Sequence, residues 1–184
     1  MPKKLVFALL VALVSLYGLA IPGAMAEVKV GDTLGILQFS KPLTPEDQKY
    51  LGLAQDAAFT LKEVNAPYVL LEAFGTSCSH CLAQAPKMNN LYNLIAQNPK
   101  LANKVKFIAV GGGDNQFGVT MWRKQLKIPF PVLPDQDTSL TKKLNIPGTP
   151  TSMLLDKSGK VLWVHIGAFD SAETAFSEIK AVIK

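Results

Sequence analysis

The sequence contains few cysteines and histidines, and their small number excludes several classes of protein. Among 184 residues there are two cysteines and two histidines. Two cysteines cannot hold together a disulfide-dense mini-protein, and they cannot supply a four-cysteine zinc site within one chain. Charged residues make up 18% and hydrophobic residues 48% of the chain, which excludes a disordered chain or a coiled coil. The composition predicts a globular domain with a hydrophobic core.

The positive charge of the chain is small and scattered. Nineteen basic residues face 14 acidic ones, for a net charge of +5. The lysines occur singly or in short pairs such as Lys142-Lys143, without interleaved aromatic residues. This pattern is typical of a solvated surface, so no nucleic-acid partner is expected.

The first 26 residues have the layout of an export signal. Lys3-Lys4 precedes an uncharged run from Leu5 to Ile21, and Ala24-Met25-Ala26 offers small residues to a signal peptidase. We therefore expect a signal peptide over residues 1–26, one domain over residues 27–184, and a periplasmic or otherwise exported location. The alternative is a retained membrane anchor, although the run is slightly short for a membrane span. Export would place the cysteines in a compartment that can oxidise them.

Alternating apolar and helical patterns predict the order of the elements. Strands are expected at residues 59–64, 68–74, 105–110, 130–133, 151–156 and 160–165, and helices at 44–54, 78–97, 117–127, from 137 or 138 to 145, and from a capping box at 170–173 to the C-terminus. Residues 111–113, three glycines, are expected to form a flexible loop. The order predicts an α/β fold with a central mixed sheet, parallel in its centre and antiparallel at its edge, flanked by helices. Residues 27–54 would form an additional N-terminal strand and helix.

Both cysteines lie in one motif, Cys78-Ser79-His80-Cys81, between a predicted buried strand and a predicted helix. Residues three apart share a helix face with Cα atoms about 5–6 Å apart, a distance that a disulfide can bridge. At the helix N-terminus the helix dipole lowers the pKa of a thiol, so we expect Cys78 to be the nucleophile. Cys81, more buried, would be the resolving thiol, and His80 can donate a hydrogen bond or place positive charge beside Cys78.

The same motif leaves alternatives without redox chemistry open. It could be a static structural bridge or part of a zinc site, whose further ligands would be His80 and His165. A metallochaperone could carry copper(I) or zinc on Cys78, Cys81 and His80. A third alternative is a binding scaffold that uses no redox chemistry. For the redox alternative, no resident metal or cofactor is expected.

The motif and its surroundings resemble the thioredoxin superfamily, and they are most similar to its exported TlpA/ResA-like thiol-disulfide oxidoreductases. Besides the cysteine pair, the resemblance rests on Glu72 six residues before Cys78, Pro86 eight residues after it, and Gly148-Thr149-Pro150-Thr151. It covers about residues 55 to 184, with further similarity at residues 59–64 and 128–135. The resemblance implies a thioredoxin-like fold and an enzyme that exchanges a dithiol and a disulfide with protein substrates.

The resemblance also implies roles for three residues outside the cysteine motif. Glu72 would take the proton of Cys81, and a lone buried carboxylate has the raised pKa that this role needs. The alternative is an acid at a frayed strand end that reaches water. Pro150 would follow a cis peptide bond and place the Thr149 backbone beside the sulfurs, where it would pair with an extended substrate. The alternative is an ordinary trans proline in a turn.

Two departures from the family pattern bear on substrate and direction. Ser77 stands where the family commonly has Trp, which predicts a more polar rim around Cys78. His80, directly before the second cysteine, resembles the strongly oxidising exported members. The direction of electron flow therefore stays open, with a slight preference for reduction from the resemblance alone. The implied partners are a membrane electron-transfer protein, as donor or acceptor, and an exported thiol protein such as apocytochrome c as client.

Overall fold

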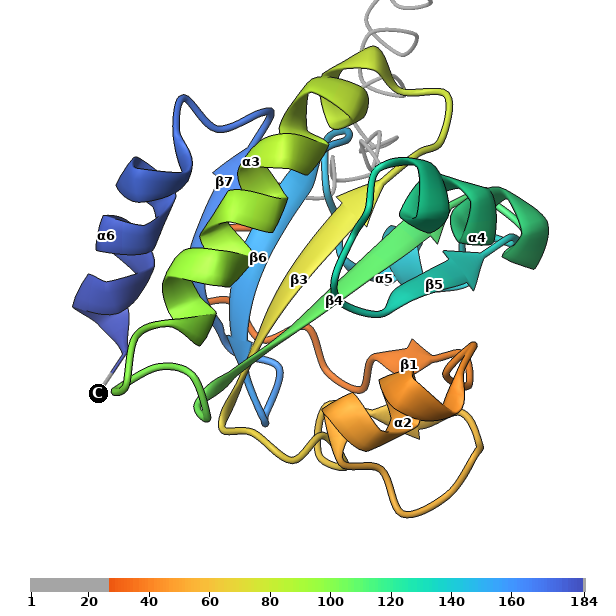
Figure 1. The fold of residues 1–184 in the computed structure, drawn as a ribbon, viewed down its shortest axis with the longest axis horizontal. Coiled ribbons are helices and arrows are strands. Elements are labelled where there is room, and N and C mark those ends of the chain that lie inside the picture. Colours follow the sequence, from red (N-terminus) through yellow and green to blue (C-terminus); the bar gives the residue numbers. More distant parts are fainter. Residues whose placement is uncertain (1–26, 184) are drawn as a thin grey trace, which may run out of the picture.

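A five-stranded mixed sheet forms the centre of the fold (Figure 1). The computed structural model describes residues 27–183, so the predicted signal peptide, residues 1–26, lies outside the described part. The strands are β3 (Tyr68–Phe74), β4 (Val105–Gly112), β5 (Val132–Asp135), β6 (Thr151–Asp156) and β7 (Val161–Ile166), in the order β5-β4-β3-β6-β7. β3, β4 and β5 are parallel, whereas β6 runs antiparallel to both β3 and β7. The predicted parallel centre and antiparallel edge are confirmed.

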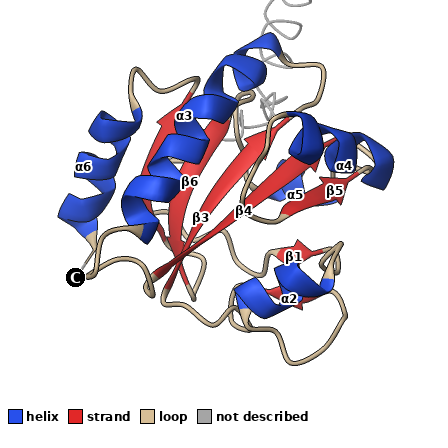
Figure 2. Cartoon of the chain, viewed as in Figure 1, coloured by secondary structure: helices blue, strands red, loops and turns tan. Residues whose placement is uncertain are grey.

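Helices cover both faces of this sheet, as Figure 2 shows. The helices α3 (Ser79–Ala96), α4 (Gln116–Gln125) and α6 (Ala172–Val182) pack on one face. The short helix α5 (Ser139–Lys143) and the N-terminal segment cover the other. Successive residues of β3 alternate between the two cores: Leu70 and Phe74 belong to the core under α3, and Val69 and Leu71 to the opposite one. A strand buried on both faces explains its nearly continuous apolar sequence.

The N-terminal segment is attached to the sheet domain by polar contacts as well as by packing. It contains β1 (Gln38–Phe39), α2 (Pro45–Leu51) and β2 (Phe59–Thr60), with β1 antiparallel to β2. Asp47 on α2 is buried and pairs with the Arg123 guanidinium of α4 at 2.6 Å. Tyr50 on the same helix accepts a hydrogen bond of 2.9 Å from the Phe107 N–H of β4. That N–H is available because β5 pairs with β4 only from Ala109 onward.

Most predicted elements agree with the structure, and two N-terminal differences have local causes. β3 and β6 have the predicted bounds, and α3 agrees within a residue at each end. The predicted strand at 59–64 is wrong after Thr60, where the Glu63 carboxylate accepts hydrogen bonds from the Thr60 N–H and hydroxyl and closes a turn. The predicted helix at 44–54 ends at Leu51 because Gly52 adopts a left-handed conformation with φ of 69°.

Boundaries in the later part of the chain also differ from prediction, and β5, predicted at residues 130–133, lies at Val132–Asp135. Gly111 and Gly112 belong to β4 rather than to a flexible loop, and a Cβ atom on Gly111 would lie 2.7 Å from a methyl carbon of Val119. Glycine is needed there because α4 approaches the strand closely. α5 begins at Ser139, later than predicted. In its first turn the N–H groups of Leu140 and Thr141 donate hydrogen bonds to the Asp135 carboxylate. The N-cap of α6 is Ser171, one residue after the predicted capping box begins.

Within residues 27–183, each helix is too short or too polar to cross a lipid bilayer.

Candidate active site

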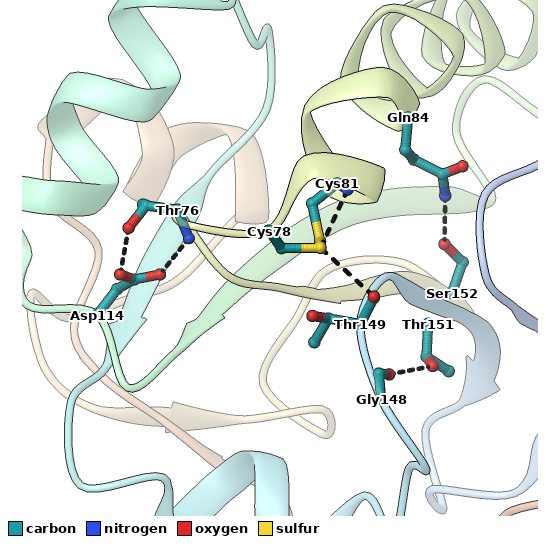
Figure 3. The surroundings of a disulfide bond; sticks show 9 residues. All are labelled: Thr76, Cys78, Cys81, Gln84, Asp114, Gly148, Thr149, Thr151 and Ser152. Carbon is teal, nitrogen blue, oxygen red and sulfur yellow. Dashed lines mark hydrogen bonds between the residues drawn. A yellow bond between two sulfur atoms is a disulfide. The ribbon is translucent and has the colours of Figure 1, made fainter.

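Three loops meet at one edge of the sheet and form the site around the cysteines (Figure 3). β3 and β4 are parallel, so both end at this edge, and β6 begins there because it runs the opposite way. The loop after β3 carries Cys78, the loop after β4 carries Asp114, and the loop before β6 carries Thr149. The topology therefore brings together residues that are far apart in the sequence.

The two cysteines form a disulfide at the start of α3. Their Cα atoms are 5.2 Å apart, and Cys78 is the N-cap residue of the helix. The Cys78 Sγ atom accepts a hydrogen bond of 3.1 Å from the Cys81 N–H. Cys78 is half-buried, whereas Cys81 is only 1% exposed. A partner can therefore reach Cys78 but not Cys81, which is the asymmetry that a nucleophile and a resolving thiol require.

The loop before β6 places backbone atoms next to the accessible sulfur. The Thr149–Pro150 peptide bond is cis. The carbonyl oxygen of Thr149 lies 3.4 Å from Cys78 Sγ, close enough to accept a hydrogen bond once the sulfur carries a proton. The loop is fixed by hydrogen bonds from the Thr151 hydroxyl to the Gly148 carbonyl and from the Gly167 N–H to the Pro150 carbonyl. Thr149 thus presents a rigid backbone edge beside the reactive atom.

Asp114 holds the opposite side of the site, a role that the sequence analysis missed. Its carboxylate accepts hydrogen bonds from the Thr76 N–H at 2.9 Å and from the Thr76 hydroxyl at 2.5 Å. These bonds tie the loop between β3 and Cys78 to the loop that follows β4. The available signal was its position: an acid just after a parallel strand lies at the same edge as the cysteine motif.

Glu72 is a buried acid in β3, the strand that leads to the cysteine motif. It occupies the middle of β3, paired with Ala109 of β4 and Ser152 of β6, and it is 6% exposed. The alternative of a frayed strand end is therefore wrong. By the alternation along β3, its side chain faces α3, on the same side of the sheet as Cys81. Burial raises the pKa of Glu72 to about 7, although a hydrogen bond from Gln84 opposes the shift.

Gln84 is a second residue that the sequence analysis missed. It is fully buried on α3, and three residues after Cys81 it shares that residue's helix face. Its side-chain amide donates to the Ser152 hydroxyl at 3.3 Å, and its oxygen accepts the Phe169 N–H at 2.7 Å. With its hydrogen bond to Glu72, it links β3, β6 and the loop before α6. The signal available in the sequence was a glutamine three residues after Cys81, on the face of the predicted helix that carries the resolving thiol.

The remaining predicted residues do not form a metal site in this oxidised state. His80 is exposed in the first turn of α3. His165 lies on β7, with its ring 6.1 Å from that of Trp163 and 5.0 Å from that of Phe169. Across residues 27–183, no three or more histidine, cysteine or acidic side chains are grouped so that they could hold a metal ion.

Fold and site together define a thioredoxin-like protein with a disulfide at the start of a helix. Residues 38–183 match the Redoxin family, and the chain belongs to that family. It is 35% identical over 108 residues to thiol-disulfide oxidoreductase ResA of Bacillus cereus, a match that covers 58% of this chain and 59% of that protein. It is 27% identical over 107 residues to ResA of Geobacillus kaustophilus. The match to each relative covers 59% of its length.

Solved structures confirm the predicted thioredoxin-like fold. A Chlorobium tepidum protein assigned as thiol:disulfide interchange protein DsbE has a TM-score of 0.64 and 22% identity, over 85% of this chain and 99% of that one. StoA from Bacillus subtilis has a TM-score of 0.55 and 22% identity, over 70% of this chain and 93% of that one. At this level of identity the likeness concerns the fold. The resemblance to ResA-like proteins inferred from the motif is confirmed by the sequence relatives.

Proposed function

We propose that the protein is an exported thiol-disulfide oxidoreductase that reduces disulfides in protein substrates. The observation that carries the proposal is the unequal exposure of two bonded sulfurs at the start of one helix. Cys78 can be reached, and Cys81 is buried on the Glu72 side of the sheet. Similarity to the ResA thiol-disulfide oxidoreductases and membership of the Redoxin family support the same chemistry.

The proposed cycle transfers two electrons from the cysteine pair to the substrate. The Cys78 thiolate attacks a substrate disulfide, forms a mixed disulfide and releases one substrate thiolate. Cys81 then loses its proton to the Glu72 carboxylate and attacks the Cys78 sulfur. The second substrate thiolate leaves, and the Cys78–Cys81 disulfide remains. A separate dithiol donor, proposed to be a membrane electron-transfer protein, reduces this disulfide and completes the cycle.

Groups around the cysteine pair support these steps. The Cys81 N–H and the N-terminus of α3 stabilise negative charge on Cys78, and His80 can donate a hydrogen bond or place positive charge beside the sulfur. A Glu72 carboxyl with a pKa of about 7 is a matched proton acceptor near neutral pH. The backbone of Thr149, before the cis Pro150, pairs with an extended substrate segment. An exported protein with cysteines to be kept reduced, such as apocytochrome c, is the proposed client.

Trapping of the mixed disulfide tests the proposal. In the Cys81→Ala variant the first attack proceeds and the second cannot, so we expect a covalent complex with a disulfide-containing protein such as insulin, visible on a non-reducing gel. The matched Cys78→Ala variant should form none. If both variants trap substrate equally, or if protein purified without oxygen holds stoichiometric copper and does not reduce insulin, the proposal is wrong.

The reduction potential of the Cys78–Cys81 pair tests the direction. A value near that of thioredoxin, about −270 mV, supports a reductase. A value near that of the strong oxidant DsbA, about −120 mV, would reverse the direction and make the membrane partner an electron acceptor.

A further inference from the structure

Exposed apolar side chains gather beside the cysteine pair. Seven large apolar side chains are exposed among residues 27–183, and three of them, Leu82, Phe117 and Met121, lie on α3 and α4. Leu82, directly after Cys81, is 53% exposed, and Phe117 is 74% exposed. Phe117 and Met121 are four residues apart, so they share a face of α4. Single exposed apolar residues are ordinary, but a cluster beside a reactive site indicates an interaction surface.

An uncharged groove of about 370 Å³ lies between α3 and α4 at this point. Leu82 lines it from α3, and Met121 lines it from α4. Thr76, two residues before Cys78, lines it as well, so the groove continues the surface of the redox site. None of its seven lining residues is charged. A charged side chain entering the groove would lose water without gaining a partner, whereas an apolar side chain would be favoured.

We infer that this groove binds an apolar side chain of the protein substrate, from the segment that flanks the substrate's cysteine. The inference rests on the proposed function, because it requires that the substrate be joined to Cys78. In the view of Figure 3, Thr149 and Thr76 lie on opposite sides of Cys78. A substrate segment that pairs with Thr149 and crosses the sulfur therefore continues toward the groove. Ser77, which stands where the family commonly has Trp, offers little apolar surface beside Cys78. The apolar side chains of α3 and α4 supply that surface instead.

The geometry also limits where in the substrate this side chain lies. Leu82 is four residues after Cys78, which corresponds to about 6 Å along a helix. An extended substrate advances about 3.3 Å per residue. An apolar residue two or three positions from the substrate cysteine can therefore reach the groove. The inferred substrates are extended segments with an apolar residue at that spacing.

Chromogenic peptide disulfides test this preference. Each peptide carries one cysteine bonded to 2-nitro-5-thiobenzoate, with Leu, Asn or Asp two or three residues to either side. The Cys78 thiolate attacks the peptide sulfur, a protein–peptide disulfide forms, and the coloured thiolate leaves and is measured by its absorbance. For the reduced protein we expect the best Leu peptide to react about tenfold faster than the Asp peptide at the same position, as partial burial of one apolar side chain predicts. The symmetrical small disulfide of the same chromophore normalises each preparation.

Variants at two lining residues separate the groove from the rest of the surface. Leu82→Ser on α3 and Met121→Ser on α4 should each lower the ratio of Leu to Asp rates, and the double variant should bring it close to one. Ile36→Ser is the matched control: it removes an apolar side chain that is 70% exposed in the N-terminal segment, and the ratio should not change.

Three results would overturn the inference. The first is equal rates for all peptides, and the second is a Leu preference that survives the double variant. The third is a concentration-dependent dimer that Met121→Ser abolishes, because a second copy of the chain would then occupy the groove. If the small disulfide also fails to react, the proposed function is wrong and this inference falls with it.

Discussion

Replacing the buried acid by its neutral amide, Glu72→Gln, should make the stability of the protein less dependent on pH. Burial raises the pKa of Glu72 from 4.5 to about 7. Below pH 4.5 the carboxyl is protonated in the folded and the unfolded state, and the stability associated with it is fully present. Between pH 4.5 and 7 the unfolded chain has released this proton and the folded protein still holds it, so stability falls as pH rises. Above pH 7 the loss is complete.

The size of the effect follows from the difference between the two pKa values. A difference of roughly 2.5 pH units corresponds to about 3 kcal/mol of unfolding free energy, a sizeable part of the stability of a small domain. Glutamine has no charge to bury and keeps the shape of the side chain. The gain in stability of Glu72→Gln over the wild type should therefore be about 3 kcal/mol larger at pH 8 than at pH 4.

Urea unfolding of the disulfide-bonded protein at the two pH values measures this difference. Glu173→Gln, on the exposed first turn of α6, is the control, and its effect should stay below about 1 kcal/mol at both values. The same Glu72→Gln substitution removes the proposed proton acceptor, so release of a mixed disulfide by Cys81 should slow by roughly 100-fold. A stability change that is equal at pH 4 and pH 8 would refute the reasoning, because Glu72 would then not hold its proton through burial.

Three further substitutions test the contacts of Gln84 near the site and of Arg123 with the N-terminal segment. Gln84→Leu removes a hydrogen bond that lowers the pKa of Glu72, so the pH profile of the Cys81 step, followed by stopped-flow, should move up by about one pH unit. Ser152→Ala removes only the hydrogen bond between Gln84 and the Ser152 hydroxyl, so it should shift the pH profile less than Gln84→Leu does. Equal shifts from the two substitutions would argue against a direct effect of Gln84 on the Glu72 carboxyl. Arg123→Gln leaves the buried Asp47 carboxylate unpaired and should lower the unfolding free energy by about 3 kcal/mol in urea titrations. A loss below about 1 kcal/mol would show that this pair does not attach the N-terminal segment.

Local sequence patterns correctly predict those helices and strands whose conformation depends mainly on the residues within them. The bounds of β3 follow from an apolar run with one acid, and the start of α3 follows from the cysteine motif after that strand. Residues 61–64 were predicted as strand from their alternation, but a side chain, that of Glu63, closes a turn there. A pattern of apolar residues does not report which polar side chain will satisfy the backbone.

The supporting residues of the site could not be predicted because their partners are distant in the sequence. Asp114 binds Thr76 from 38 positions away, and Gln84 accepts the Phe169 N–H from 85 positions away. Neither contact follows from the spacing of residues along one element. They require the strand order β4-β3-β6, which brings the ends of three strands to one edge. The sequence motif therefore predicts the two cysteines and the acid of the proposed site. The topology determines which residues, such as Asp114 and Gln84, hold the surrounding loops and helix in place.

The chemistry proposed for the two cysteines and the acid has a common physical origin in the packing of α3 against β3. This packing buries Cys81 and leaves Cys78 half-exposed, so a substrate meets only one sulfur first. It also removes Glu72 from water, which raises the pKa of its carboxyl to about 7 and makes it a useful base near neutral pH. The hydrogen bond from Gln84, on the same helix, limits that rise. A change that loosens the start of α3 should therefore expose Cys81 and lower the pKa of Glu72 together, because water reaches both groups by the same opening.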